Sequence, residues 1–233
     1  MRVNPVSVEM IKTVALGLGE LNERAVYVGG ATVPFYLPEE YWPQARPTED
    51  IDVVMEIMGN TKNWANEEEL RKKGFQHDTS EGAPICRWIY KGLKVDVISS
   101  DESVFGFTNK WYKEGIIQAI SVSLRPQVRI FSLPYFLGTK MEAFKGRGRG
   151  DYQASTDMED IISVLEVAPE KMWNEGLSTS SKALGTYLKT ELEHLKNKPG
   201  FVDALPGAIF NRETSIEATQ SVIRRMDKII KSL

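Results

Sequence analysis

The chain has 233 residues, of which 42% are hydrophobic and 26% charged, and its formal net charge is −3. This composition suits a globular protein with one large core or two small ones, and the acidic balance argues against a wholly basic nucleic-acid-binding protein. The sequence contains no run of about eighteen apolar residues, so no membrane span is expected. Cys86 is the only cysteine, which excludes an internal disulfide, and the amino terminus lacks the pattern of a secretory signal. We therefore expect a cytoplasmic protein.

The amino-terminal part alternates between helical and strand patterns. Apolar residues at helical spacing predict a helix over residues 6–21, and the apolar run around Val26 predicts a strand. Gly29-Gly30 then predicts a turn, after which a helix beginning at Thr32 ends at Leu37-Pro38. An alternating pattern predicts the next strand over residues 50–57.

The middle of the chain reads as one helix followed by short strands. An acidic start, a basic finish and Gly74 predict a helix over residues 66–74. Two strands joined by a tight Lys91-Gly92 hairpin and two further strands are predicted over residues 85–90, 93–99, 116–124 and 128–131.

The pattern becomes helical from Leu133 onward. Helices are predicted over residues 133–144, 157–167, 171–196 and 214–233. The sequence therefore predicts an α/β protein, with a mixed sheet and flanking helices in residues 1–132 and a helical domain in residues 133–233.

Three carboxylates are the leading candidates for a functional site. Asp50 and Asp52 fall on one face of their predicted strand, where two negative charges repel unless a proton or a metal ion offsets them. Asp96 interrupts the strand over residues 93–99, although an edge strand with Asp96 in solvent would look the same. Oxygen ligands of this kind suit a divalent cation.

Strand, glycine turn and helix around Gly29-Gly30 form a second candidate. Glycine lets a ligand approach the backbone closely, and a helix start presents N–H groups to a phosphate. A plain tight turn would have the same sequence.

Together these motifs resemble the polymerase-beta-like nucleotidyltransferase superfamily. The run from Arg46 through Thr48 to Asp52, the segment 133–144 with Arg147 beyond it, and Asp157 to Ile161 are similar to the AbiEii-like abortive-infection toxins of toxin–antitoxin systems. The resemblance covers residues 25–165. It departs from many members of the superfamily in having Gly29-Gly30 in place of Gly-Ser, and residues from Pro169 onward match no known pattern.

The resemblance implies transfer of a nucleotide from an NTP to an acceptor hydroxyl. Two Mg²⁺ ions would be held by Asp50, Asp52 and Asp96, and Asp96 would also accept the hydroxyl proton. The triphosphate would be held by Gly29, Gly30, Arg46, Thr48 and Lys140, of which Lys140 is the preferred catalytic cation. Supporting ionic roles fall to Arg147, Asp157 and Asp160.

The implied acceptor is the 3′ end of tRNA, and a cognate antitoxin would be the protein partner. Three alternatives remain open from the sequence. The acceptor could be a small molecule of the aminoglycoside type or a protein hydroxyl. The fold could bind nucleotide without turnover. A metal-dependent nuclease would also use the carboxylates, but it leaves the Gly29-Gly30 turn without a role.

Overall fold

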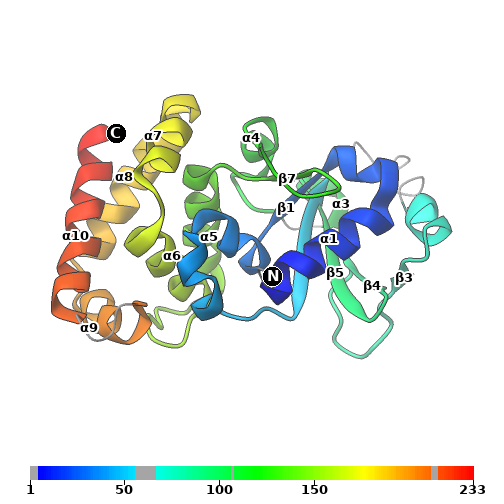
Figure 1. Ribbon diagram of the computed structural model, residues 1–233, viewed down its shortest axis with the longest axis horizontal. Helices are drawn as coiled ribbons and strands as arrows, with labels where there is room; N and C mark the ends of the chain where they lie inside the picture. Colours follow the sequence, from blue (N-terminus) through cyan, green and yellow to red (C-terminus); the bar gives the residue numbers. More distant parts are fainter. Residues whose placement is uncertain (1–4, 56–66, 106–107, 211–214) are drawn as a thin grey trace. The chain divides into compact units, whose positions relative to one another are not determined.

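The computed structural model describes residues 5–55, 67–105, 108–210 and 215–233. It contains a mixed seven-stranded sheet with flanking helices and a helical carboxy-terminal region (Figure 1), which confirms the predicted α/β class. The chain forms two compact units: Met1–Thr32 with Pro47–Phe131, and Val33–Arg46 with Ser132–Leu233. Residues 33–46 thus belong to the helical unit, although they precede most of the sheet in the sequence.

The first unit contains the whole sheet, in the order β3-β4-β5-β2-β1-β7-β6. The strands are β1 (Ala25–Val28), β2 (Asp50–Met55), β3 (Gln76–His77), β4 (Arg87–Tyr90), β5 (Leu93–Ser99), β6 (Ile120–Val122) and β7 (Val128–Ile130). The pairs β2–β5 and β1–β7 are parallel, and the other neighbours are antiparallel. The central strands β1, β2 and β5 are the most buried, so the core of this unit lies along them.

The β4–β5 hairpin has the predicted two-residue turn. Lys91 and Gly92 both have positive φ angles, 49° and 79°, and Tyr90 pairs with Leu93 across the turn. Positive φ at both central residues matches the twist of the flanking strands, which fixes the register of the whole hairpin. The predicted strand over residues 50–57 is described only as far as Met55, because residues 56–66 lie outside the described part.

The helices of the first unit correct two predictions. Those with defined bounds are α1 (Val6–Leu18), the 3-10 helix η1 (Gly19–Arg24), α3 (Glu102–Phe105) and α4 (Tyr112–Ile117). Residues 67–72 are also helical, which confirms the helix predicted over residues 66–74 as far as it is described. The first predicted helix ends at Gly19, where φ is +54°, and the chain continues as a 3-10 helix. Ile116 and Ile117, predicted as strand, close α4 instead, because Gly115 allows Phe131 to pack directly against that helix.

The second unit is helical. It contains α5 (Leu133–Arg147), α6 (Thr156–Val167), α7 (Glu170–Thr179), α8 (Lys182–Lys196), α9 (Pro199–Ala208) and α10 (Ser215–Ser232). Helix α5 packs against α6, α7 and α8, and α10 packs against α6, α8 and α9. No helix in the described ranges is both long and apolar enough to cross a membrane.

Two predictions about these helices were wrong. The helix predicted over residues 171–196 is broken at Ser180 and Ser181, where the Ser181 hydroxyl accepts a hydrogen bond from the Leu184 N–H at 3.2 Å. A serine that caps a helix start ends the preceding helix as well. Helix α9 was not predicted, although Pro199 stands at its first turn, a favoured position. The start predicted for the last helix, at residue 214, lies outside the described residues, and its described part begins at Ser215.

The segment 33–46 packs within the second unit through aromatic side chains. It comprises the end of the 3-10 helix η2 (Gly30–Tyr36) and η3 (Glu39–Gln44). The ring centroids of Tyr36 and Phe136 are 4.6 Å apart, and those of Tyr41 and Phe210 are 5.4 Å apart. The Trp42 indole donates to the Pro34 carbonyl at 2.8 Å.

Candidate functional site

The three predicted carboxylates meet on adjacent strands of the first unit. Strands β2 and β5 run parallel, and Asp52 is the register partner of Asp96. Asp50 lies two residues before Asp52, on the same face of β2. The side chains of Asp50 and Asp96 both bond one guanidinium, which shows that they face the same space. The register therefore places all three side chains on one face of two adjacent strands.

Arg87 on β4 is the positive group of this cluster, and the sequence analysis missed it. Its Nε donates to Asp96 Oδ1 at 2.7 Å and its terminal nitrogen to Asp96 Oδ2 at 2.8 Å. The same terminal nitrogen donates to Asp50 Oδ2 at 3.2 Å. Two parallel bonds to one carboxylate are a strong arrangement for arginine. Arg87 thus joins two of the three carboxylates.

The electrostatics follow from this pairing. The hydrogen bond to Asp96 raises the pKa of Arg87 against the opposing effect of burial, and the charges of Asp96 and Asp50 add to it. The neighbouring Cys86 thiol is buried, and burial together with the negative charge of Asp96 raises its pKa to about 11. A thiol that stays protonated is a poor nucleophile.

Gly29 lies directly against Asp52. Its φ angle is +73°, and a Cβ atom at this position would collide with Oδ2 of Asp52. Only glycine satisfies both conditions. The Gly29 carbonyl also accepts from the Thr32 hydroxyl at 2.8 Å and from the Thr32 N–H at 3.2 Å, which fixes the turn through the buried Gly30.

The segment after this turn differs from the prediction. Gly30–Tyr36 is a 3-10 helix of seven residues with Pro34 inside it. Proline removes a donor, and short 3-10 segments align fewer peptide groups than an α-helix does. Any phosphate contact at Gly29 and Gly30 would therefore depend on single backbone amides more than on a helix dipole.

Thr48 orients the acidic pair. Its hydroxyl lies 3.2 Å from Asp50 Oδ1 and 3.3 Å from the Asp50 carbonyl, at the start of β2. This contact orients Asp50, whereas the triphosphate-binding role that the resemblance implies for Thr48 stays a prediction.

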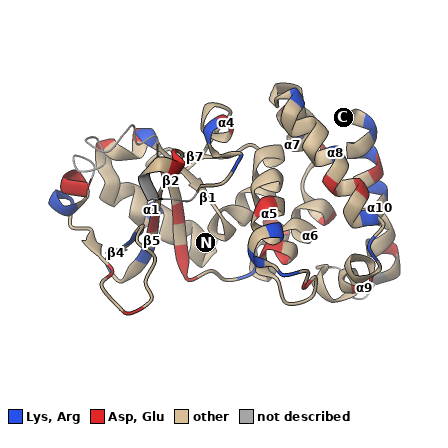
Figure 2. Cartoon of the chain, turned by 180° about the vertical axis from the view of Figure 1, so that it is seen from behind, with Lys and Arg blue, Asp and Glu red and all other residues tan. Residues whose placement is uncertain are grey.

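The other predicted site residues form an ion-pair cluster in the second unit. Lys140 on α5 is 5% exposed, and its ammonium lies 3.0 Å from Asp157 Oδ1 and 2.6 Å from Asp160 Oδ2. Arg147 donates to Asp157 through two bonds of 2.7 and 2.8 Å. Arg46 donates to Asp160 at 3.3 and 3.4 Å. Figure 2 shows both basic and acidic positions on α5 and acidic positions on α6.

The pKa shifts of this cluster show that the opposite charges outweigh burial. Burial alone would lower the pKa of Lys140, but the charges of Asp160 and Asp157 raise it overall. Burial would raise the pKa of Asp157, yet the Arg147 hydrogen bond and the Lys140 charge lower it. Asp157 and Asp160 thus have the ionic partners expected of them. A phosphate-binding role for Lys140 stays a prediction, since its ammonium bonds two carboxylates.

The carboxylates can be tested for their fit to magnesium. Their chemistry fits, because Mg²⁺ prefers carboxylate oxygens and Asp50, Asp52 and Asp96 supply three carboxylates on one face. Their arrangement does not form a complete ligand set, since no group of three acidic, histidine or cysteine side chains within the described ranges is placed to hold a metal. Arg87 explains why suitable ligands do not form a complete ligand set, because it bonds both oxygens of Asp96 and one of Asp50. An ion held by all three carboxylates would require this guanidinium to release an oxygen of Asp96.

Comparisons with known proteins add little to this site. No family model matches the sequence, and no curated protein matches it. Among solved structures the chain is similar to JHP933 from Helicobacter pylori, with 11% sequence identity and a TM-score of 0.46. The alignment covers 97% of this chain and 92% of that one. A likeness this weak carries no argument about function.

Proposed function

We propose that the protein is a magnesium-dependent nucleotidyltransferase that moves a nucleotide from an NTP to an acceptor hydroxyl. The observation that supports this most strongly is the meeting of Asp50, Asp52 and Asp96 beside the Gly29 turn. A domain without chemistry gains nothing from three carboxylates on one face of its sheet, since they repel. The sequence resemblance described above supports the same reaction.

Each part of the cluster has a role in the proposed reaction. Asp50, Asp52 and Asp96 would hold the magnesium, which when bound would offset the triphosphate charge and favour attack on phosphorus. Gly29 and Gly30 would offer backbone N–H groups to the triphosphate. The acceptor oxygen would bond to the α-phosphorus as the bond to pyrophosphate breaks. Asp96 would take the hydroxyl proton, which requires Arg87 to free one of its oxygens.

The 3′ end of tRNA is the preferred acceptor, with a small molecule as the alternative within the same chemistry. If the resemblance to abortive-infection toxins holds, the protein is a cytoplasmic toxin and an antitoxin protein neutralises it. These finer assignments come from the sequence motifs alone.

One observation favours a second function, nucleotide binding without turnover. Arg87 already offsets the charge of Asp50 and Asp96, as expected of a domain that does not need a metal ion to hold its carboxylates together. Such a domain would sense NTP through the Gly29 turn.

The decisive experiment follows label from each NTP. The protein is incubated with Mg²⁺, one α-labelled NTP, total tRNA and an aminoglycoside, beside the variants Asp50→Asn/Asp52→Asn and Glu49→Gln. Glu49 is a matched control, because it is the neighbouring carboxylate but its side chain is 87% exposed and pairs with Lys94 on the surface.

Label on RNA with the unchanged protein and E49Q, and none with the double variant, is the expected result. Label on the aminoglycoside would give the same chemistry with a small acceptor. Binding of NTP without label on either acceptor would favour the sensor, and shortened RNA without label would favour a nuclease.

A further inference from the structure

A basic groove lies in the second unit between α7 and α10. Its volume is about 690 Å³. Helix α10 contributes four cationic side chains to its lining, and among the described residues Glu170 of α7 is the only carboxylate that lines it. The four cations are Arg224, Arg225, Lys228 and Lys231. The groove is therefore strongly positive in a chain whose net charge is −3. This imbalance indicates a ligand with several negative charges.

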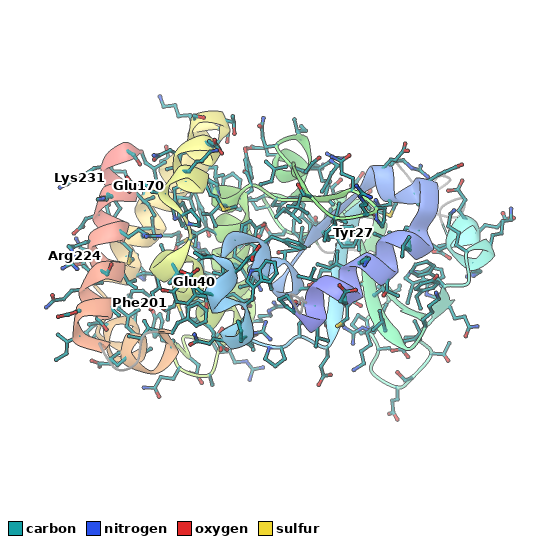
Figure 3. The ribbon with its side chains drawn as sticks, in the orientation of Figure 1. Tyr27, Glu40, Glu170, Phe201, Arg224 and Lys231 are labelled. Atoms are coloured by element: carbon teal, nitrogen blue, oxygen red, sulfur yellow. The ribbon has the colours of Figure 1, made fainter. Side chains whose placement is uncertain are left out.

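Two of the four cations form no ion pair within the described ranges. No ion pair within the described ranges involves Arg224 or Lys231, which are both exposed residues of α10 (Figure 3). Lys228 pairs with Glu170 only at 3.7 Å, and both side chains are about 70% exposed, a geometry that contributes little to stability. These three cations are available to a ligand.

Arg225 has a different role from its neighbours. Its guanidinium donates to the Ala168 carbonyl after α6, and burial lowers its pKa. This contact attaches α10 to the end of α6. The base of the groove is closed by Trp173 and Ile229, which are 3% and 4% exposed. The cations of α10 are thus presented by a packed helix rather than by a loop.

The spacing of the available cations favours a chain of charges over a single ion. Arg224, Lys228 and Lys231 stand at i, i+4 and i+7 on one face of α10. At 1.5 Å of rise per residue this stripe is about 10 Å long. One phosphate ion cannot contact both ends of it, whereas successive phosphates of a strand can. Lys231 lies in the last turn, where a cation also compensates the helix dipole, but Arg224 lies two turns earlier.

The cationic charge of the lining favours phosphates over a protein segment. Protein interfaces depend on apolar and aromatic side chains at their centre, and here Trp173 and Ile229 are covered. At its surface the groove offers the four charges and the polar side chains of Asn174, Ser221 and Ser232, beside the half-buried Leu177 and the aliphatic stems of the cations. Arginine, lysine, serine and asparagine are the residues that contact the phosphates of nucleic acids.

We propose that the groove between α7 and α10 binds the phosphate backbone of a single nucleic-acid strand. This inference goes beyond the proposed transfer reaction, because binding here requires neither NTP nor the carboxylates of the first unit. RNA and DNA present the same phosphate chemistry, so the test includes both.

The test compares two variants that lose the same charge. Arg224→Gln/Lys231→Gln removes two cations from the groove, and Lys182→Gln/Lys189→Gln removes two exposed lysines of α8 that do not line it. All four residues lie on the surface of the second unit, and circular dichroism checks that each variant folds. Binding of a fluorescein-labelled RNA 12-mer, and of DNA with the same sequence, is followed by anisotropy as KCl is raised.

We expect salt-dependent binding that falls about tenfold in the groove variant, with the slope of log K against log salt reduced by about 1.4, the value for two contacts to a single strand. The α8 variant should keep both the affinity and the slope. Equal binding of RNA and DNA and binding of RNA alone would both support the proposal. The comparison would also show which nucleic acid the groove binds. Equal losses in the two variants, or no salt-dependent binding of either strand, would overturn the proposal.

Two further arms separate this proposal from its rivals. If a poly-glutamate peptide binds instead of nucleic acid and is lost in the groove variant, the groove takes an acidic protein segment and the proposal is wrong. The D50N/D52N variant should bind RNA as the unchanged protein does. If RNA binds through the groove but no nucleotide is transferred, only the proposed transfer reaction is rejected. If a nucleotide is transferred but RNA binding does not depend on the groove, only the groove proposal is rejected.

Discussion

At the scale of single residues, the carboxylate cluster depends on one arginine. Asp96 is 7% exposed and accepts two bonds from Arg87. A carboxylate that is this buried loses hydration, and only a well-oriented partner compensates for the loss. Because Arg87 also reaches Asp50, it relieves the repulsion between strands β2 and β5.

Arg87→Gln should therefore destabilise the protein by about 3 kcal/mol in the absence of Mg²⁺, since it leaves a buried carboxylate without its counter-charge. Added Mg²⁺ should recover more of the free energy of unfolding in R87Q than in the unchanged protein, because the freed oxygens become available as ligands. Urea denaturation with and without Mg²⁺ measures both effects. Arg71→Gln is the control, because Arg71 pairs with Glu67 at the surface. The prediction would be contradicted if R87Q had an unchanged free energy of unfolding and gained no more from Mg²⁺ than the unchanged protein does.

Gly29 allows a second test, because Gly82 has a similar φ angle but open surroundings. Gly29 and Gly82 have φ angles of +73° and +79°, but no atom lies within 4 Å of a Cβ added at Gly82. Gly82→Ala should cost about 1 kcal/mol from backbone strain alone. Gly29→Ala should cost clearly more, since it must also displace Asp52, and it should reduce Mg²⁺ binding measured by calorimetry. Equal losses of stability in the two variants would show that the Asp52 contact is unimportant.

At the scale of elements, the sequence could predict most strands because their alternation was regular. It could not separate Ile116-Ile117 from a strand, because a short apolar run fits a buried helix equally well. The position of Arg87 could have been predicted from the sequence. The Lys91-Gly92 turn fixes Tyr90 opposite Leu93. Three residues before Tyr90 and three residues after Leu93, the same register places Arg87 opposite Asp96.

The contacts between α5, α6 and segment 33–46 depend on tertiary packing, which no local pattern encodes.

The pairing of α5 with α6 predicts a specific pH dependence. The pKa of Asp157 is lowered from 3.8, so its ion pairs with Arg147 and Lys140 stabilise the folded state above that pH, and the contribution is lost as the pH falls through the lowered value. Asp157→Asn should cost about 3 kcal/mol at neutral pH, and the difference from the unchanged protein should shrink below pH 3.8.

Urea denaturation between neutral pH and pH 3 measures this difference. Asp203→Asn is the matched control, because Asp203 is an exposed carboxylate on α9 of the same unit. A D157N penalty that stays constant across this range would mean that packing rather than charge joins the two helices.

At the scale of the whole molecule, the chain does not divide at a single point. The predicted division at residue 132 would cut segment 33–46 away from the helical unit to which it belongs. That cut would leave the rings of Phe136 and Phe210 without the contacts of Tyr36 and Tyr41. It would also remove Arg46 from the buried Asp160 carboxylate, which would keep only Lys140.

A fragment of residues 132–233 should therefore unfold at lower temperature, and with less cooperativity, than the same fragment mixed with a peptide of residues 33–46. Because the peptide binds only the folded fragment, the midpoint should rise with peptide concentration. Thermal unfolding followed by circular dichroism measures the shift, and a scrambled peptide of the same composition is the control. Replacing Arg46 in the peptide by glutamine should weaken the rescue, since Asp160 then lacks its second cation. A fragment whose unfolding midpoint ignores the native peptide would show that the helices alone determine the fold of this unit.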